Sequence, residues 1–190
     1  NGIVDLNNDG RKDLFVAGGA VMDPRGEFHE KVMQTNLVMA NLGKFKFADA
    51  TPGAGPDFST KRGTHRGGAF GDIDNDGRID AVVTALDEAV EVWRNLSPTP
   101  NRWLQVKAVG TRSSRDGINA EIKLTSASGV QHNHVNNAVG YSSASDLRVH
   151  FGLGKDEVVT KLEVKWPSGI RQVLENVPTN QVLTVREPEK

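Results

Sequence analysis

Residues 5–13 read DLNNDGRKD, and residues 72–80 read DIDNDGRID. Both stretches, here named loop 1 and loop 2, fit the pattern D-x-[DN]-x-D-G-x-x-D. Each runs directly into an apolar segment, at residues 14–17 and 81–83. Because the second copy begins 67 residues after the first, the repetition indicates a structural unit that occurs twice.

Oxygen-bearing side chains occupy positions 1, 3, 5 and 9 of each loop, and glycine occupies position 6. The glycine permits a sharp turn that lets these oxygens converge, and position 7 adds its backbone carbonyl. Hard oxygen ligands in this number suit Ca²⁺ better than Zn²⁺ or Cu²⁺, and Mg²⁺ prefers a stricter octahedron with retained waters. The sequence therefore predicts two calcium loops with the ligands Asp5, Asn7, Asp9, Arg11, Asp13, Asp72, Asp74, Asp76, Arg78 and Asp80, the arginines acting through their carbonyls.

Two other interpretations of the loops fit less well. An EF-hand begins with the same pattern but needs glutamate at position 12 and helices on both sides. Position 12 is Val16 in loop 1 and Val83 in loop 2, and the flanks are glycine-rich or β-branched, as in strands. A metal-free Asp/Asn/Gly turn is the second alternative. Crowded carboxylates repel one another unless a cation lies among them, so the full recurrence of the pattern favours a calcium loop in a β-hairpin.

The N-terminal half resembles a known repeat family. Residues 68–77, GAFGDIDNDG, are similar to the FG-GAP/VCBS (integrin α-type) repeat, and residues 41–51, NLGKFKFADAT, look like its closing strand. The resemblance implies calcium-carrying blades of a β-propeller over residues 1–96. Propellers typically need 4–8 blades to close, so we expect these two to be the C-terminal part of a longer propeller. Residues 20–35 have no counterpart in the second copy and are expected to form a surface loop.

A second part of the chain follows the turn-rich linker at residues 97–101, SPTPN. Apolar and polar residues then alternate in short segments near residues 104–108, 120–124, 147–151, 162–166 and 182–185. This pattern predicts a small β-sandwich or open barrel over residues 101–187. No segment has a sustained helical period, so we expect an all-β fold for the chain.

Several motifs of this second part resemble the ASPIC/UnbV domain. They are WLQV at residues 103–106, GTRSSRD at 110–116, GYSS at 140–143, FGLG at 151–154 and WPSG at 166–169. The resemblance implies a domain that commonly follows FG-GAP-type repeats in secreted proteins. Where the family usually has Ile-Gly-Ala, this chain has Asn119 in place of glycine. Asparagine tolerates the left-handed backbone better than most residues, so we expect the turn to be retained.

Composition excludes several classes of protein. The 190 residues carry 23 basic and 24 acidic side chains, without the basic excess typical of nucleic-acid-binding proteins. The chain has no cysteine, which excludes disulfides, thiol nucleophiles, cysteine-ligated zinc and iron–sulfur clusters. No apolar run reaches the roughly 18 residues of a membrane-spanning helix, so no membrane span is expected.

We expect no enzyme activity and no catalytic residues, because no Walker loop, G-x-S-x-G elbow or H-E-x-x-H motif occurs. His132 and His134 would share one face of a strand, and chance exposure is favoured over a metal role. His150 alternates with core residues and is expected to face solvent. Trp166 is expected in the core, whereas Tyr141 is the aromatic residue most suited to ligand contact, beside serines that form a turn.

Two functional hypotheses follow. The first is a non-catalytic, extracellular calcium-binding module that binds a protein or a glycan. The second is the C-terminal part of a secreted carbohydrate-active enzyme, such as a polysaccharide lyase, with its active site in upstream blades. The loops favour a secreted, periplasmic or cell-surface location, because millimolar extracellular calcium fills even weak sites. Loop 2 has four carboxylates and loop 1 has three, which predicts tighter binding by loop 2.

Overall fold

The computed structural model describes residues 1–20 and 33–189. Its secondary structure is dominated by strands, arranged in several sheets, none of which closes on itself in the described part of the chain. The all-β prediction is therefore confirmed. Most of the predicted insertion at residues 20–35 lies outside the described residues. Among the helices that are described, none is long and apolar enough to cross a membrane.

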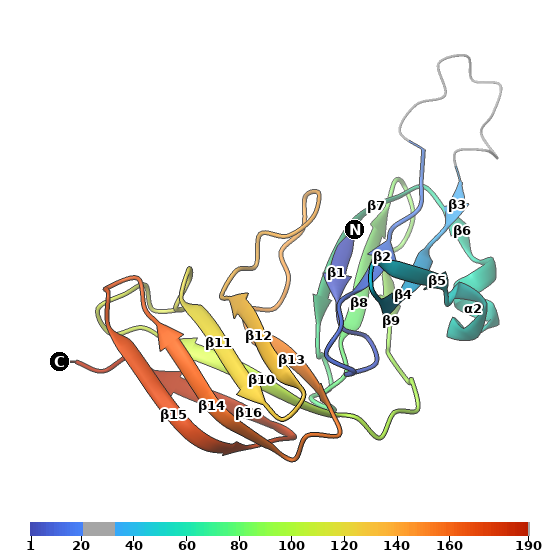
Figure 1. The fold of residues 1–190 in the computed structure, drawn as a ribbon. Coiled ribbons are helices and arrows are strands. Elements are labelled where there is room, and N and C mark those ends of the chain that lie inside the picture. The colour runs from blue at the N-terminus through green and yellow to red at the C-terminus, as the bar shows by residue number, and fades with distance from the viewer. Residues whose placement is uncertain (21–32, 190) are drawn as a thin grey trace.

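Two antiparallel sheets form the N-terminal part of the structure (Figure 1). The first contains, in spatial order, β1 (Gly2–Val4), β2 (Asp13–Val16), β4 (Leu37–Gly43) and β5 (Lys46–Asp49). The second contains β7 (His65–Gly71), β8 (Asp80–Ala85) and β9 (Glu91–Trp93), and a short pair joins β3 (Gln34–Thr35) to β6 (Arg62–Gly63). Loop 1 connects β1 to β2 and loop 2 connects β7 to β8, so the sequence repeat is a repeat of loop-bearing hairpins.

An aromatic cluster joins these two N-terminal sheets. Phe15 on β2 and Phe70 on β7 meet edge to face, with ring centroids 5.3 Å apart. Phe58, on the short helix α2 (Pro56–Thr60) that follows the 3-10 helix η1 (Thr51–Ala54), packs against Phe15 at 5.7 Å. All three rings are buried, and Val83 completes this core with no exposed surface. The sheets therefore share one apolar interior, as neighbouring blades must.

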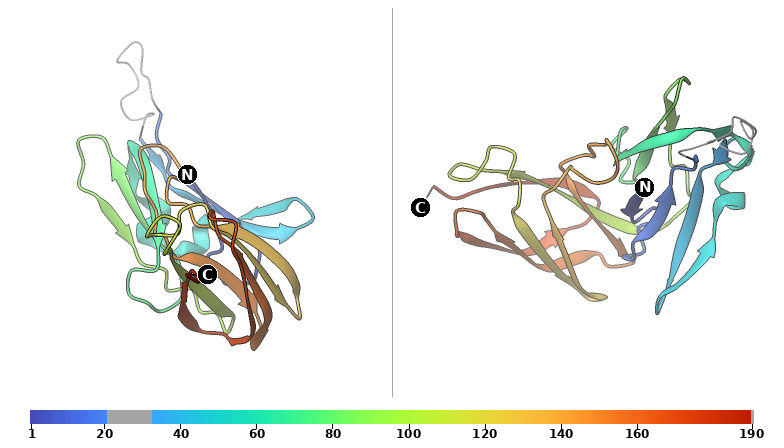
Figure 2. Two further views of the ribbon diagram at one scale, coloured as in Figure 1. Left: turned by 90° about the vertical axis from the view of Figure 1, so that its left-hand side faces the viewer. Right: turned by 90° about the horizontal axis from the view of Figure 1, so that it is seen from above.

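The C-terminal part is a sandwich of two sheets around its own core, beside the N-terminal sheets (Figures 1 and 2). One sheet has the order β13 (Val149–Gly154), β10 (Arg102–Val109), β16 (Gln181–Arg186), and the other has the order β12 (Gly129–His134), β11 (Glu121–Ser126), β14 (Val158–Lys165), β15 (Arg171–Pro178). Leu104, Phe151 and Leu162 are fully or almost fully buried between the sheets. Trp166 is 1% exposed, which confirms that it belongs to this core.

The sequence pattern identified five of these seven strands and missed β12 and β15. Strand β12 reads GVQHNH and carries no residue of the buried core. Strand β15 contributes Val177 to the core but has exposed residues along most of its length. Both strands lie at the edges of their sheet, where one face of a strand is open and polar residues are tolerated. Asn119 has a φ of 68°, so the expected left-handed turn is retained.

Glu187 fixes the C-terminal end of the sandwich. Its side chain is only 1% exposed, and Oε2 accepts the backbone N–H groups of Thr111, Arg112 and Ser113 at 2.7–2.9 Å. The hydroxyls of Ser113 and Ser168 donate to Oε1. Burial raises the pKa of Glu187, but these hydrogen bonds outweigh it and lower the pKa to about 2. An ionised carboxylate therefore ties the chain end to the 110–116 segment.

Truncation inside the sandwich core tests this packing. Leu162→Ala removes a fully buried side chain and should lower the free energy of unfolding by about 2–5 kcal/mol, because it leaves a cavity. Val173→Ala, at a 50% exposed position of the adjacent strand, is the matched control and should change it by less than about 1 kcal/mol. Urea unfolding monitored by tryptophan fluorescence measures both. Equal losses would contradict the assigned core.

The Glu187 anchor predicts a pH dependence. The folded pKa of about 2 lies below the ordinary 4.5, so the stabilisation is present above pH 4.5 and is lost as the pH falls towards 2. At pH 6 we expect Glu187→Gln to lower the free energy of unfolding by about 1–3 kcal/mol. This difference from wild type should shrink at pH 3. Urea denaturation at each pH measures it, and a deficit independent of pH would argue against an ionised anchor.

Candidate metal centre

The two Asp-rich loops adopt the same backbone conformation. Asn8 and Gly10 in loop 1 have φ values of 60° and 85°, and Asn75 and Gly77 in loop 2 have 61° and 86°. Positions 4 and 6 of the repeat are therefore both left-handed, a conformation that asparagine and glycine adopt most readily. The turn at the glycine was predicted from the sequence. The left-handed asparagine was not, although asparagine recurs at position 4 in both copies.

The aspartate at position 1 organises each loop from inside. Asp5 and Asp72 are each 1% exposed. Their carboxylates accept the backbone N–H groups of positions 5 and 6, at 3.1 and 2.8 Å in loop 1 and at 3.0 and 2.9 Å in loop 2. Hydrogen bonds to a charged acceptor are stronger than neutral ones, so this aspartate holds the loop in its curled form.

The aspartate at position 9 joins the loop to the third strand of its sheet in loop 1, and to the residues just after that strand in loop 2. Asp13 accepts the backbone N–H groups of Leu6 and Asn41 at 3.0 and 2.8 Å. Asp80 accepts those of Ile73 and Asn95 at 2.9 and 2.7 Å. Both carboxylates are buried. Each loop is therefore closed at its start and at its end by a buried negative charge.

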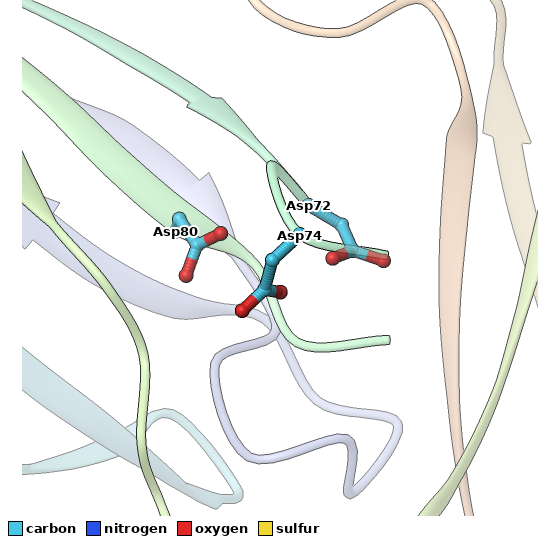
Figure 3. Close-up of side chains that lie close together, drawn as sticks. All are labelled: Asp72, Asp74 and Asp80. Atoms are coloured by element: carbon cyan, nitrogen blue, oxygen red, sulfur yellow. The ribbon is translucent and has the colours of Figure 1, made fainter. Parts of the chain in front are cut away.

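Three predicted ligands of loop 2 come together. Carboxylate oxygens of Asp72, Asp74 and Asp80 all lie within 4.8 Å of one another, at the loop and at the start of β8 (Figure 3). Asp72 and Asp80 are buried, whereas Asp74 is exposed. Like charges this close repel one another strongly in a poorly hydrated site, and a bound cation relieves the repulsion. These residues fit a hard divalent ion that prefers oxygen ligands.

Loop 1 differs from loop 2 at position 3. Asn7 stands where loop 2 has Asp74, and its Oδ1 accepts the backbone N–H of Asp9 at 3.1 Å. Burial raises the pKa of Asp5 to about 6, although the Gly10 N–H acts in the opposite direction. Burial also raises the pKa of Asp13. Desolvated carboxylates with raised pKa values are groups that a cation would favour in their ionised form.

Arginines hold the remaining carboxylates of the loops. Arg11 contacts Asp9 and also donates to the carbonyl of Asn41 in β4. Arg78 contacts Asp76 in the same way and donates to the carbonyl of Asn95, just after β9. Arg94 forms an ion pair with Asp74 at 2.5 Å. The prediction included position 7 for its carbonyl alone, and the structure adds a role for its side chain. Asp9, Asp76 and the cluster member Asp74 are thus each paired with an arginine.

The prediction that His150 faces solvent is wrong. His150 is 7% exposed, and its Nε2 lies 3.2 Å from the carbonyl oxygen of Gly77. Burial lowers its pKa to about 3, so the ring is neutral. The strand alternation was assigned correctly, since His150 points away from the sandwich core. The face it occupies is covered by the two loops, which the sequence of β13 could not reveal.

Gln105 was missed by the sequence analysis. It is 1% exposed, and its Nε2 donates to Oδ2 of Asp72 at 2.6 Å. Its Oε1 is buried without a hydrogen-bond partner among the described residues. Gln105 lies on β10 directly opposite His150 on β13. The only sequence signal was a polar residue between Leu104 and Val106, which is ordinary for a strand with one open face.

The remaining residues singled out from the sequence are serines near Tyr141, Tyr141 itself and two histidines of β12. Ser143 and Ser145 accept the backbone N–H groups of Gly68 and Phe70, so these serines bind the segment after Tyr141 to strand β7. Tyr141 is 70% exposed. His132 and His134 lie on β12, and neither belongs to a cluster of three candidate metal ligands within the described residues.

Comparison with protein families assigns both parts of the chain. A profile of the FG-GAP-like repeat matches residues 5–83, and a profile of ASPIC and UnbV matches residues 110–190. The chain joins FG-GAP-like repeats to an ASPIC/UnbV domain. The first match covers both Asp-rich loops, and the second covers most of the sandwich. The two resemblances drawn from the sequence motifs are confirmed.

Cartilage acidic protein 1 from different vertebrates is similar to this chain. Cartilage acidic protein 1 of Xenopus tropicalis is 31% identical over 98% of this chain, which corresponds to 28% of the frog protein. Cartilage acidic protein 1 of Homo sapiens is 33% identical over 66% of this chain, or 19% of the human protein. The chain thus spans less than a third of the length of these relatives.

Loop 2 packs closely against the sandwich at Gly77, so adding a methyl group at this glycine tests the contact. A Cβ on Gly77 would lie 1.9 Å from the Trp103 ring, and its φ is 86°. Gly169, with a φ of 92° and no atom within 4 Å of such a Cβ, is the matched control for backbone strain alone. We expect Gly77→Ala to lower the free energy of unfolding by about 1–3 kcal/mol more than Gly169→Ala. Equal losses in thermal or urea unfolding would contradict the contact.

Proposed function

We propose that this chain is a non-catalytic, extracellular interaction module in which Ca²⁺ stabilises the FG-GAP-like region. The proposed ligands are the ten residues expected from the sequence, five from each loop. The proposed domains are residues 1–96 for the FG-GAP-like part and residues 101–187 for the ASPIC/UnbV part. A protein or a glycan outside the cell is the proposed partner.

The observation that carries this proposal is the cluster of Asp72, Asp74 and Asp80. Its three carboxylates lie close together and two of them are buried, so their mutual repulsion favours a cation among them. Support also comes from loop 1, where the same backbone and the same buried aspartates recur. Carboxylates together with backbone carbonyls are the ligand set that Ca²⁺ uses, and their number suits Ca²⁺ better than Mg²⁺.

The proposed location follows from calcium chemistry. Sites in extracellular modules commonly bind Ca²⁺ with dissociation constants of about 10⁻⁴–10⁻³ M, and millimolar extracellular Ca²⁺ fills such sites.

A partner surface would use exposed aromatic side chains, which contribute large contact areas. Tyr141 is 70% exposed beside β7, and Phe45 is fully exposed at the turn between β4 and β5. These two residues are the proposed first points of contact.

Calcium should stabilise the chain measurably. A ligand at tenfold excess over its dissociation constant adds about 1.4 kcal/mol per site to the free energy of unfolding. We expect millimolar Ca²⁺ to raise the melting temperature by several degrees relative to EGTA, and Mg²⁺ at the same concentration to raise it by clearly less. Differential scanning calorimetry measures the shifts. If neither ion, or both ions equally, changed the melting temperature, the calcium proposal would fail.

A matched pair of variants distinguishes the contributions of loop 1 and loop 2 to the calcium-dependent rise in melting temperature. Asp9 and Asp76 make equivalent contacts, each accepting the backbone N–H of the following arginine at 2.8 and 2.9 Å. Because loop 2 has one more carboxylate, Asp76→Ala should reduce the calcium-dependent shift more than Asp9→Ala. The reverse order would show that carboxylate number does not set the affinity.

A further inference from the structure

The two Asp-rich loops are covered by the ASPIC/UnbV domain and its linker. In loop 1, the carbonyl of Asn8 accepts the backbone N–H of Gly154 at 2.8 Å, and the carbonyl of Asn7 accepts Nδ2 of Asn101 at 2.9 Å. A Cβ on Gly152 would lie 2.0 Å from Oδ2 of Asp5, so strand β13 passes directly over the first aspartate. Loop 1 is therefore packed against the backbone of the neighbouring domain.

Loop 2 makes a more polar contact with the same domain. Gln105 donates to the carboxylate of Asp72 at 2.6 Å. Arg148 donates to the Asp72 carbonyl and to Oδ1 of Asn75, both at 2.6 Å. Trp103 packs against Gly77, at the position where a side chain would collide with it. The loop thus presents a proposed ligand, a carbonyl and a glycine to the domain that covers it.

The loops and the domain converge on the carbonyl oxygen of Gly77. Nδ2 of Asn8 donates to it from loop 1 at 3.0 Å, and His150 reaches it from β13 at 3.2 Å. Gln105 lies opposite His150 on the neighbouring strand, so its amide belongs to the same buried group. Both FG-GAP-like loops and the sandwich therefore meet in one buried polar cluster.

We propose that the loops couple cation binding to docking of the ASPIC/UnbV domain, and that Gln105 is the positioning residue at loop 2. This inference rests on the proposed calcium binding. Gln105 orients Asp72 through a hydrogen bond, as outer partners of metal ligands do, and such partners contribute about 10–100-fold to metal affinity. Coupling between two binding equilibria is reciprocal, so a domain that strengthens cation binding is itself held more firmly when the cation is bound.

One experiment measures cation affinity. Gln105→Met keeps the approximate volume of the side chain and removes the amide. It is made in an Asp9→Ala background, in which loop 1 is weakened. Calcium titration calorimetry of this variant therefore reports on the affinity of loop 2. We expect its calcium affinity to fall about tenfold. In an Asp76→Ala background, where loop 1 is followed, the same change should have little effect. Gln172→Ala, a glutamine that binds Trp166 far from the loops in the sandwich, is the matched control and should leave both affinities unchanged.

The second experiment measures docking without relying on the Gln105 variant. The chain has no cysteine, so Lys46→Cys and Glu175→Cys, at exposed positions on β5 and β15, allow specific spin labelling. Pulsed electron paramagnetic resonance gives the distribution of distances between the labels. We expect a narrow distribution in Ca²⁺, a broader one in EGTA, and an intermediate width for Gln105→Met in Ca²⁺.

The outcomes separate this inference from the proposed function. Absence of calcium binding by the wild-type chain overturns both. Calcium binding with an unchanged affinity in Gln105→Met removes the role of Gln105. Calcium binding with a distance distribution that is the same in Ca²⁺ and EGTA overturns the coupling and leaves the calcium sites intact. Fold integrity of each variant is established by its thermal transition before titration.

Discussion

A buried aspartate at the first position of each loop is the constraint on which the rest of the structure depends. Asp5 and Asp72 have almost no exposed surface, and each accepts two backbone N–H groups from its own loop. A buried carboxylate without such partners would be strongly destabilising, so the loop can adopt only conformations that supply them. The curled loop in turn fixes how β1 pairs with β2 and how β7 pairs with β8.

The same loops determine how the two parts of the chain meet. The described residues form two separate apolar cores, one around Phe15 and Phe70 and one around Leu104 and Phe151. The parts meet through hydrogen bonds and close glycine packing at the loops, and through hydrogen bonds between residues 143–146 and strand β7. Directional polar contacts define a geometry more narrowly than apolar ones, and they are costly when only half formed. The loops and strand β7 together therefore set the position of the sandwich.

This arrangement places the candidate metal centre at an interface between domains. Asp72 belongs to the cluster with Asp74 and Asp80, and it also accepts Gln105 from the neighbouring domain. Arg94 forms an ion pair with Asp74, and Arg78 forms one with Asp76. The candidate centre thus combines carboxylates of loop 2, arginines from that loop and from the residues after β9, and an amide from the sandwich. The charges and hydrogen-bond donors around these carboxylates therefore come from both parts of the chain.

Much of this architecture follows from the sequence alone. Nine-residue loops with aspartate, glycine and asparagine at fixed positions determine a local conformation, because each position serves a hydrogen bond or a left-handed backbone within the loop. Alternation predicted most strands, since Leu162 and Trp166 must leave water wherever the strand lies. Strands β12 and β15 were missed because edge strands need few buried residues. The tertiary structure alone decided that His150 and Gln105 are buried. A strand residue off the core face is exposed unless another element covers it, and what covers it here comes from parts of the chain about 30 to 140 residues away.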